Sequence, residues 1–348
     1  MSSIWLDIII VAYLVAFLAY TAWHMTRKGG FFSVVGGLAL TAGSIAAVIL
    51  FGARWSHTGQ PPFTTLFETL LLLAAGMGFL YLGLSLFHDL RGFGLPVALA
   101  VLLVTAYATV QEQAAPQLVP ALRNSFWLTI HVIFCFLGYG ALALSFMAAL
   151  GCLVSGRGRS SDLALYVVAL TLAAVMCTGA LVLLFKSGVL TLRSHAGDGT
   201  AVQGGARGFS MFDAAVVVAA CFTLAGLLWF VMAALDKRWD VSARLAGHIE
   251  TLAHVCDKST AIGFGLLGLG IITGAVWAEV AWGRYWGWDP KETSSLITWL
   301  VYFVALHLRY MKGWQGTRAY WVSVFGFACV LFTWFGVNYL LGGLHAYL

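Results

Sequence analysis

The sequence predicts an all-α fold, a polytopic transmembrane helix bundle of about ten spans with both termini on the extracytoplasmic side. Of the 348 residues, 61% are hydrophobic and only 9% are charged, against roughly 25% charged in an average soluble domain. This is too little polar surface to cover a soluble protein of that size, so most of the exterior must face lipid. The net charge of +5 is small and scattered, which excludes a nucleic-acid-binding surface.

Each predicted span is an apolar stretch of about 20 residues, the length that crosses a bilayer. The stretches cover residues 4–25, 32–53, 64–87, 93–110, 127–153, 163–185, 212–235, 260–280, 295–311 and 318–341. The longer connections are expected at 111–126, 186–211, 236–259 and 281–294. The first stretch contains Asp7, follows no basic segment and lacks a small-residue cleavage site, so it is interpreted as a retained span.

The distribution of Lys and Arg over alternate loops predicts the orientation in the membrane. One set of loops carries twelve of the nineteen basic residues: Arg27, Lys28, Arg91, Arg157, Arg159, Lys237, Arg238, Arg244, Lys258, Arg309, Lys312 and Arg318. The other set carries the remaining seven: Arg54, Arg123, Lys186, Arg193, Arg207, Arg284 and Lys291. Because the richer side is the cytoplasmic one, both termini and the loops 111–126 and 281–294 are expected outside.

An aromatic loop between the eighth and ninth spans is the most informative stretch. It places four of the fourteen tryptophans within twelve residues: Trp277, Trp282, Trp286 and Trp288. One interpretation is an interfacial aromatic belt. The other is a surface for a porphyrin, because Gly283 and Gly287 allow close approach, the indoles offer stacking faces and Arg284 or Lys291 would meet propionates. The segment Asp289-Pro290-Lys291-Glu292 also has the pattern of a capping box that begins the ninth helix.

Three of the nine histidines are candidates for iron ligands. His131 lies near the outer end of the fifth span and His345 follows the last span, so two imidazoles on the same side flank the aromatic loop. His307 lies near the inner end of the ninth span, where an ionisable residue is a functional candidate. The others are expected to be solvated, in loops or at inner helix ends: His24, His57, His88, His195, His248 and His254.

Six cysteines occur singly and mostly in apolar stretches, without C-x-x-C spacing. They are interpreted as packing residues, and a c-type cytochrome is excluded by the missing C-x-x-C-H.

At this point the residues resemble a known family. Trp282-Gly283-Arg284-Tyr285-Trp286-Gly287-Trp288-Asp289, with the following Pro-Lys-Glu-Thr, is similar to the tryptophan-rich WWD signature of the CcsA (ResC) family of System II cytochrome c biogenesis. Ile130–Val132 and 336–347 resemble that family's segments around its outer histidines. Pro62–Glu68 is similar to its Pro-x-x-Asn-x-Tyr-Glu stretch, with Thr65 and Phe67 in place of Asn and Tyr. Because of these differences, no functional role is assigned to the stretch. Glu68 is interpreted as an interfacial cap.

The resemblance implies a haem-handling subunit of a cytochrome c synthase, a lyase acting as part of a complex. Haem b would reach an extracytoplasmic WWD site formed by Trp282–Asp289 and be joined to the C-x-x-C-H thiols of an apocytochrome c. His131 and His345 would ligate the outer haem iron, and His307 an inner haem within the bundle. A CcsB (ResB)-like membrane partner would supply the second inner ligand, with His24 or His88 as the alternative source. The membrane would be a bacterial cytoplasmic membrane or a thylakoid membrane.

The same resemblance divides the chain into three parts. Residues 1–153 hold the N-terminal helices with the outer-histidine helix, 154–258 an inserted pair of helices with loops, and 259–348 the WWD region with the last helices. Three alternatives stay open: a CcmC-like presenter that loads haem onto a chaperone, a transporter or structural subunit with an aromatic belt, and a b-type electron-transfer subunit. No residue in the chain has the pattern of a nucleophile or general base, so catalysis is expected to rest on the positioning of haem.

Overall fold

The computed structural model describes residues 2–26, 30–63, 65–109, 111, 126–155, 190–191, 207–208 and 248–337. The chain forms two compact units, the first made of 1–153 with 245–348 and the second of 154–244. In the second unit the described residues are Val154 and Ser155, which end a helix, and one pair of two-residue parallel strands, β1 (Leu190–Thr191) and β2 (Arg207–Gly208). The predicted spans 163–185 and 212–235 lie outside the described residues.

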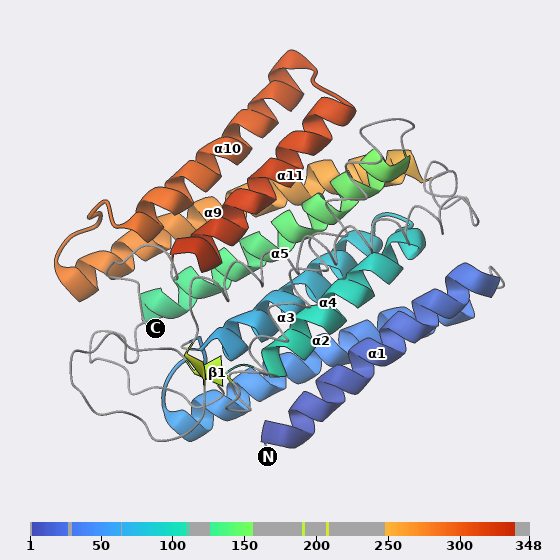
Figure 1. Cartoon of the computed structure of the whole chain (residues 1–348), viewed down its shortest axis with the longest axis horizontal. Coiled ribbons are helices and arrows are strands. Elements are labelled where there is room, and N and C mark those ends of the chain that lie inside the picture. Colours follow the sequence, from blue (N-terminus) through green and yellow to red (C-terminus); the bar gives the residue numbers. More distant parts are fainter. Residues whose placement is uncertain are drawn as a thin grey trace. The chain divides into compact units, whose positions relative to one another are not determined.

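In the described part of the first unit all regular secondary structure is helical, which confirms the predicted fold class (Figure 1). Its amino-terminal helices are α1 (Ser2–Thr26), α2 (Phe31–Thr58), α3 (Leu66–Ser85), the 3-10 turn η1 (Arg91–Phe93), α4 (Gly94–Thr109) and α5 (Phe126–Ser155). Its carboxy-terminal helices are α9 (Ile249–Trp282), α10 (Pro290–Lys312) and α11 (Thr317–Leu331), followed by the π-helical turn η3 (Phe332–Gly336).

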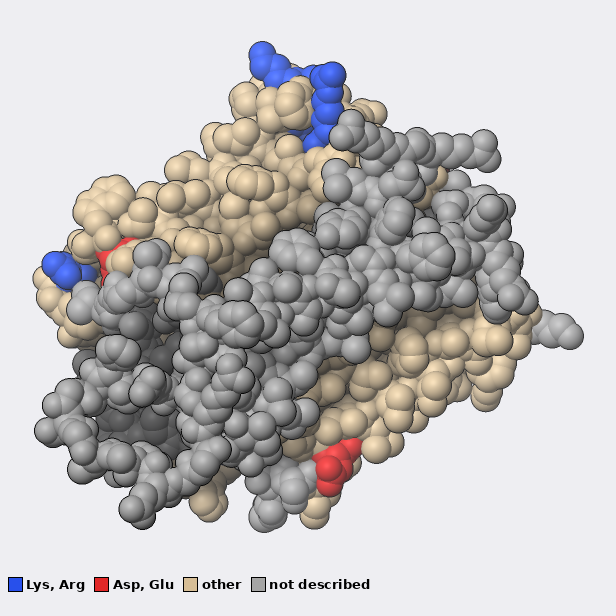
Figure 2. Space-filling model, in the orientation of Figure 1, with Lys and Arg blue, Asp and Glu red and all other residues tan. Residues whose placement is uncertain are grey.

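Seven of the described helices are long and apolar enough to cross a membrane. They are α1, α2, α3, η1 with α4, α5, α9, and α11 with η3. Large apolar side chains such as Leu18, Val34 and Leu38 point outward from them. In the view of Figure 2, the charged side chains of the described residues form a few small groups, and most of the other described surface is uncharged. This surface fits a chain whose helices are surrounded by lipid.

Helix α10 matches the predicted ninth span but is more polar than the other helices. Its first turns carry Lys291, Glu292 and three hydroxyl residues before the apolar part begins. Its length of 23 residues is sufficient to cross a bilayer. The total number of spans and the side on which the termini lie stay predictions.

Helix α9 begins about three turns earlier in the chain than the sequence predicts. The sequence placed 236–259 in a connection, whereas α9 already begins at Ile249. The polar residues Glu250, Asp257 and Lys258 interrupt the apolar pattern, which hid this part of the helix. The helix continues there because Asp257 forms an ion pair with Arg309 of α10. His254, expected in a solvated loop, therefore lies within a helix.

Small residues allow the amino-terminal helices to pack closely. The ring of Tyr20 fills a space where a Cβ on Gly36 or Gly94 would lie less than 3.0 Å from it. The ring of Tyr13 occupies the same kind of space beside Gly43. The Tyr20 hydroxyl also lies 3.2 Å from that of Tyr81. Glycine contacts and buried hydroxyl pairs of this kind drive helix association in lipid, where burial of apolar surface contributes little.

Helix α5 packs against α9 through the same kind of contact. A Cβ on Gly138 would lie 3.1 Å from the backbone nitrogen of Leu267, and one on Gly263 would lie 2.6 Å from the Leu142 side chain. Further along α5, the hydroxyls of Ser145 and Thr260 are 2.7 Å apart. This close pairing fixes the register of α5 along α9, on which the candidate site depends.

Candidate functional site

His131, in the second turn of α5, is oriented by a hydrogen bond to α9. Its Nδ1 lies 2.7 Å from the carbonyl oxygen of Gly270 on α9. A carbonyl oxygen only accepts hydrogen bonds, so Nδ1 must carry the proton and donate it. In the neutral ring Nε2 then bears the lone pair, which is the form that ligates a metal. Metal-ligating histidines are usually oriented by a bond of this kind.

Two glycines of α9 create the space for this histidine. A Cβ on Gly274 would lie 2.6 Å from His131 Nδ1, and a Cβ on Gly270 would lie 2.6 Å from the Cys135 sulfur. The Cys135 thiol is itself 3.6 Å from His131 Nδ1. Any larger residue at either glycine would push α5 away or turn the imidazole.

A series of rings leads from His131 toward the aromatic loop. The imidazole stacks on Trp277 at 6.5 Å between centroids with an interplanar angle of 9°. Trp277 is only 2% exposed and meets Trp282 edge to face at 4.8 Å. His131 and the beginning of the predicted WWD segment are therefore neighbours.

The loop after α9 is ordered by the start of the next helix. Gly283 ends α9 with a φ of 70°, and the Glu292 carboxylate accepts hydrogen bonds from the backbone of Gly287 at 2.8 Å and Asp289 at 3.2 Å. Asp289 accepts a bond from Lys291 N at 3.0 Å. The predicted capping box of Asp289 and Glu292 is confirmed. Burial lowers the pKa of the Lys291 ammonium, which precedes the apolar part of α10.

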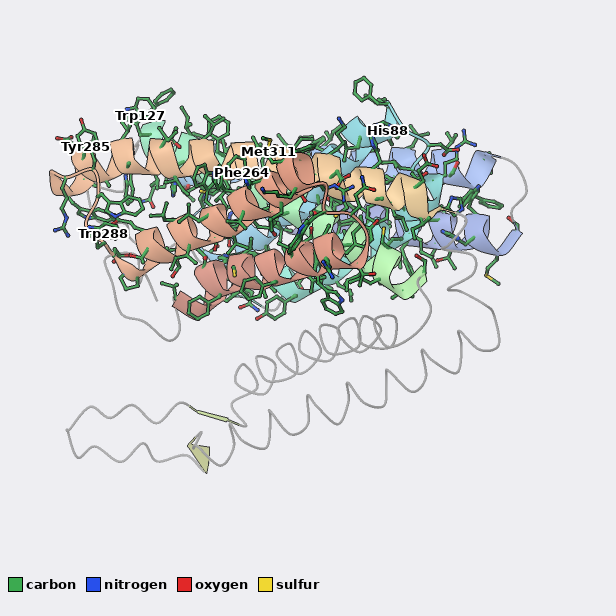
Figure 3. The ribbon with its side chains drawn as sticks, turned by 90° about the horizontal axis from the view of Figure 1, so that it is seen from above. His88, Trp127, Phe264, Tyr285, Trp288 and Met311 are labelled. Carbon is green, nitrogen blue, oxygen red and sulfur yellow. The ribbon has the colours of Figure 1, made fainter. Side chains whose placement is uncertain are left out.

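The tip of this loop displays aromatic rings to the surroundings. Tyr285 is 61% exposed and Trp288 69%, and both lie at one end of the helices in Figure 3. Trp288 has a φ of 55°, an uncommon conformation for a bulky residue. Its ring meets Trp286 edge to face at 5.8 Å. Such conformations persist where the surroundings enforce them and often mark ligand-binding positions.

The other two predicted iron ligands do not join this cluster within the described residues. His345 lies outside them. His307 is on α10 but on its exposed face, stacked on Phe303 at 6.3 Å, rather than inside the bundle as expected. The reason is helical periodicity, because Thr298 and Tyr302 occupy the buried face and thereby turn position 307 outward.

Comparison with known proteins identifies the family. Residues 63–345 match the model of a family described as cytochrome C assembly protein. The chain belongs to this family. It is 34% identical to a cytochrome c biogenesis protein CcsA of Synechococcus elongatus over 90% of this chain and 87% of that one. A CcsA of Nostoc punctiforme is 32% identical over 91% and 89%, and one of Microcystis aeruginosa 33% over 90% and 87%. The resemblance to the CcsA family is thus confirmed, and with it a role in cytochrome c biogenesis.

The positioning residues around His131 were not predicted from the sequence. Gly270 and Gly274 lie on α9, and Gly270 is 139 residues away from His131 along the chain. The glycines at 263, 270 and 274 do provide a signal, because small residues at helical spacing favour a close helix contact. That signal identifies neither the helix that packs against α9 nor the register of the two helices.

The substitution Gly274→Ala tests this close contact. We expect it to turn the His131 ring or separate α5 from α9, at a cost of about 1–3 kcal/mol in unfolding free energy. Gly265→Ala is the matched control on the same helix, because a Cβ there would meet nothing within 4 Å. Thermal unfolding in detergent measures the difference, and equal melting temperatures for the two variants would contradict the described packing.

Proposed function

We propose that this chain is the haem-handling subunit of a System II cytochrome c synthase, a lyase that acts as part of a complex. It receives haem b at an extracytoplasmic WWD site and presents it for attachment to the C-x-x-C-H segment of apocytochrome c. The observation that carries the proposal is the hydrogen bond from His131 Nδ1 to Gly270, together with the stacking on Trp277. It prepares an imidazole for iron beside the family's aromatic loop.

The proposed haem seat combines iron ligands with a ring-binding surface. His131 and His345 are the axial ligands, one from α5 and one from the segment after η3. The ring-binding surface is Trp282, Gly283, Arg284, Tyr285, Trp286, Gly287, Trp288 and Asp289. A Cβ on Gly287 would lie 2.9 Å from the Arg284 guanidinium, so the loop backbone runs directly beside a cation suited to a propionate. The indoles supply stacking faces for the macrocycle.

The chemistry on this seat is addition of two cysteine thiols to the two vinyl groups. Each sulfur bonds to a vinyl carbon and the proton goes to the other carbon, so no net oxidation occurs. The chain contributes position: the ligated haem is held with its vinyl edge toward the incoming peptide. The histidine of C-x-x-C-H then displaces one axial ligand, which releases the product.

The outward face of α10 is proposed to contact a CcsB (ResB)-like membrane partner. That face is exposed and largely apolar, and its members are Ile297, Leu300, Phe303, Val304, His307 and Met311. An imidazole in contact with lipid is unfavourable, and ionisable residues in spans usually face protein or a polar cavity. His307 is therefore proposed to share an inner haem iron with a ligand from the partner, in a bacterial cytoplasmic or thylakoid membrane.

Coexpression tests this function. The chain, its partner and an apocytochrome reporter are produced in a bacterial host that lacks its own cytochrome c maturation, and covalent haem is measured by haem stain on denaturing gels. Stained reporter is expected only when chain, partner and both C-x-x-C-H cysteines are present. Haem-loaded chain without stained reporter, and with transfer to a separate chaperone, would instead support a CcmC-like presenter.

A further inference from the structure

Two histidines that the haem chemistry leaves unused face each other across the first unit. His88 lies in the turn after α3 and His254 in the second turn of α9, 166 residues apart in the chain. Their Nε2 atoms are 3.1 Å apart and their ring centroids 4.4 Å. Both rings are half-buried. The expectation that each is a separately solvated imidazole is wrong.

The pair lies in the part of the molecule opposite the aromatic loop. Figure 3 shows His88 well separated from Tyr285 and Trp288 along the length of the helices. Two further histidines gather near the same turn: His24 Nε2 is 3.2 Å from the carbonyl oxygen of Gly92, and a Cβ on Gly92 would lie 3.7 Å from the His248 ring. The loop charges predict that this end faces the cytoplasm.

The spacing of the two nitrogens fits cis ligands of a single cation. Two imidazole nitrogens on one tetrahedral ion, each about 2.0–2.1 Å from the metal, lie about 3.3–3.4 Å apart. Cis positions of an octahedral ion bring them to about 2.9 Å. The observed 3.1 Å lies between these values, so a cation would be held after shifts of a few tenths of an ångström.

Three acidic side chains lie near the pair, and two of them are already in ion pairs with arginines. Glu250 stands one turn before His254 on the same side of α9, and Asp257, one turn after it, pairs with Arg309. Asp89 follows His88 directly, is exposed and pairs with Arg91 at 3.4 Å. Among the described residues, no group of three or more His, Cys, Asp or Glu is arranged as a complete metal cage. A cation here would therefore keep coordination positions for water or a small ligand, as catalytic and transport sites do.

We propose that His88 and His254 form a binding site for a divalent transition-metal cation of the Zn²⁺, Cu²⁺ or Ni²⁺ class. Imidazole is a preferred ligand of these ions. The site joins the α3–α4 turn to α9 and so ties the amino-terminal helices to the helix that ends at the aromatic loop. It is separate from the proposed haem seat and does not depend on it.

A haem iron does not fit between these rings. Two axial imidazoles ligate haem iron from opposite faces of the porphyrin. Their ligating nitrogens are then about 4 Å apart, and the plane of the porphyrin lies between them. The centroids here are 4.4 Å apart at an interplanar angle of 75°. The alternative is a direct hydrogen bond between the two imidazoles without metal, and the experiment must distinguish it from a metal site.

The test uses the full chain purified with a tag that contains no histidine and stripped of metal with a chelator. Cu²⁺ is added, its affinity is measured by equilibrium dialysis, and pulsed electron paramagnetic resonance counts the imidazoles on the ion. Wild type is expected to bind one Cu²⁺ with two imidazoles. His88→Gln and His254→Gln are each expected to lower the affinity at least about tenfold.

His57→Gln is the matched control, because His57 is exposed in the last turn of α2. It is expected to keep the wild-type affinity. Gel filtration confirms that each variant is monodisperse, and the wild-type spectrum is informative by itself if one variant aggregates. A wild-type signal with fewer than two imidazoles, or unchanged affinity in both His88→Gln and His254→Gln, would overturn the proposal in favour of a metal-free hydrogen bond.

Discussion

The substitution His131→Ala is expected to reduce cytochrome c maturation to background in the coexpression system. It removes the imidazole whose Nδ1 donates to Gly270 and whose Nε2 is proposed to ligate iron. Added imidazole should restore a large part of the activity, because the small molecule enters the space left by the side chain and ligates the iron. Haem staining of the reporter, with and without imidazole, measures both effects.

Imidazole rescue separates ligation from folding. A variant that has lost only an iron ligand responds to imidazole, whereas a misfolded one does not. His57→Ala, at the exposed end of α2, should mature the reporter as wild type does. Full activity of His131→Ala without imidazole would show that the ligand assignment is wrong.

The substitution Arg54→Met is expected to cause the largest loss of stability, about 3–5 kcal/mol, because it leaves a buried carboxylate without its ion-pair partner. Arg54 Nε and Nη2 each lie 2.8 Å from Oε1 of Glu68, and Glu68 is only 2% exposed. The other carboxylate oxygen accepts a bond from Thr65 N, so that Glu68 also caps α3 as predicted. Unfolding in detergent measures the loss.

Arg91→Met is the matched control for that loss. The Arg91–Asp89 pair is 3.4 Å long, and its side chains are 59% and 74% exposed, so its removal should cost about 0–1 kcal/mol. The double substitution of Arg54→Met with Glu68→Leu should recover part of the stability, since no buried charge remains. Equal effects of Arg54→Met and Arg91→Met would contradict the burial of the pair.

Local patterns predicted most of the helices and their ends. Apolar stretches located α1–α5 to within a few residues, and the sequence Asp289-Pro290-Lys291-Glu292 gave the start of α10 together with its cap. These features depend on neighbouring residues alone, namely on hydrophobic length and on side chains that reach the first backbone N–H groups.

Features that depend on contacts between residues far apart in the sequence were not predicted. The polar start of α9 is compatible with a helix because Arg309 pairs with Asp257, 52 residues away. The bond from His131 to Gly270 and the contact of His88 with His254 likewise join segments whose register no local pattern encodes. Helical spacing places His307 on the outward face of α10, but this requires knowing which face of α10 is buried.

Haem binding at His131 and the aromatic loop is tested by the absorption spectrum of the chain purified with its partner, beside the His131→Ala variant. We expect a low-spin b-type haem in wild type and, in the variant, loss of haem or a change of spin state that imidazole reverses. An identical low-spin spectrum in both proteins, or a colourless wild type from haem-replete cells, would contradict the proposal that His131 and the aromatic loop hold haem.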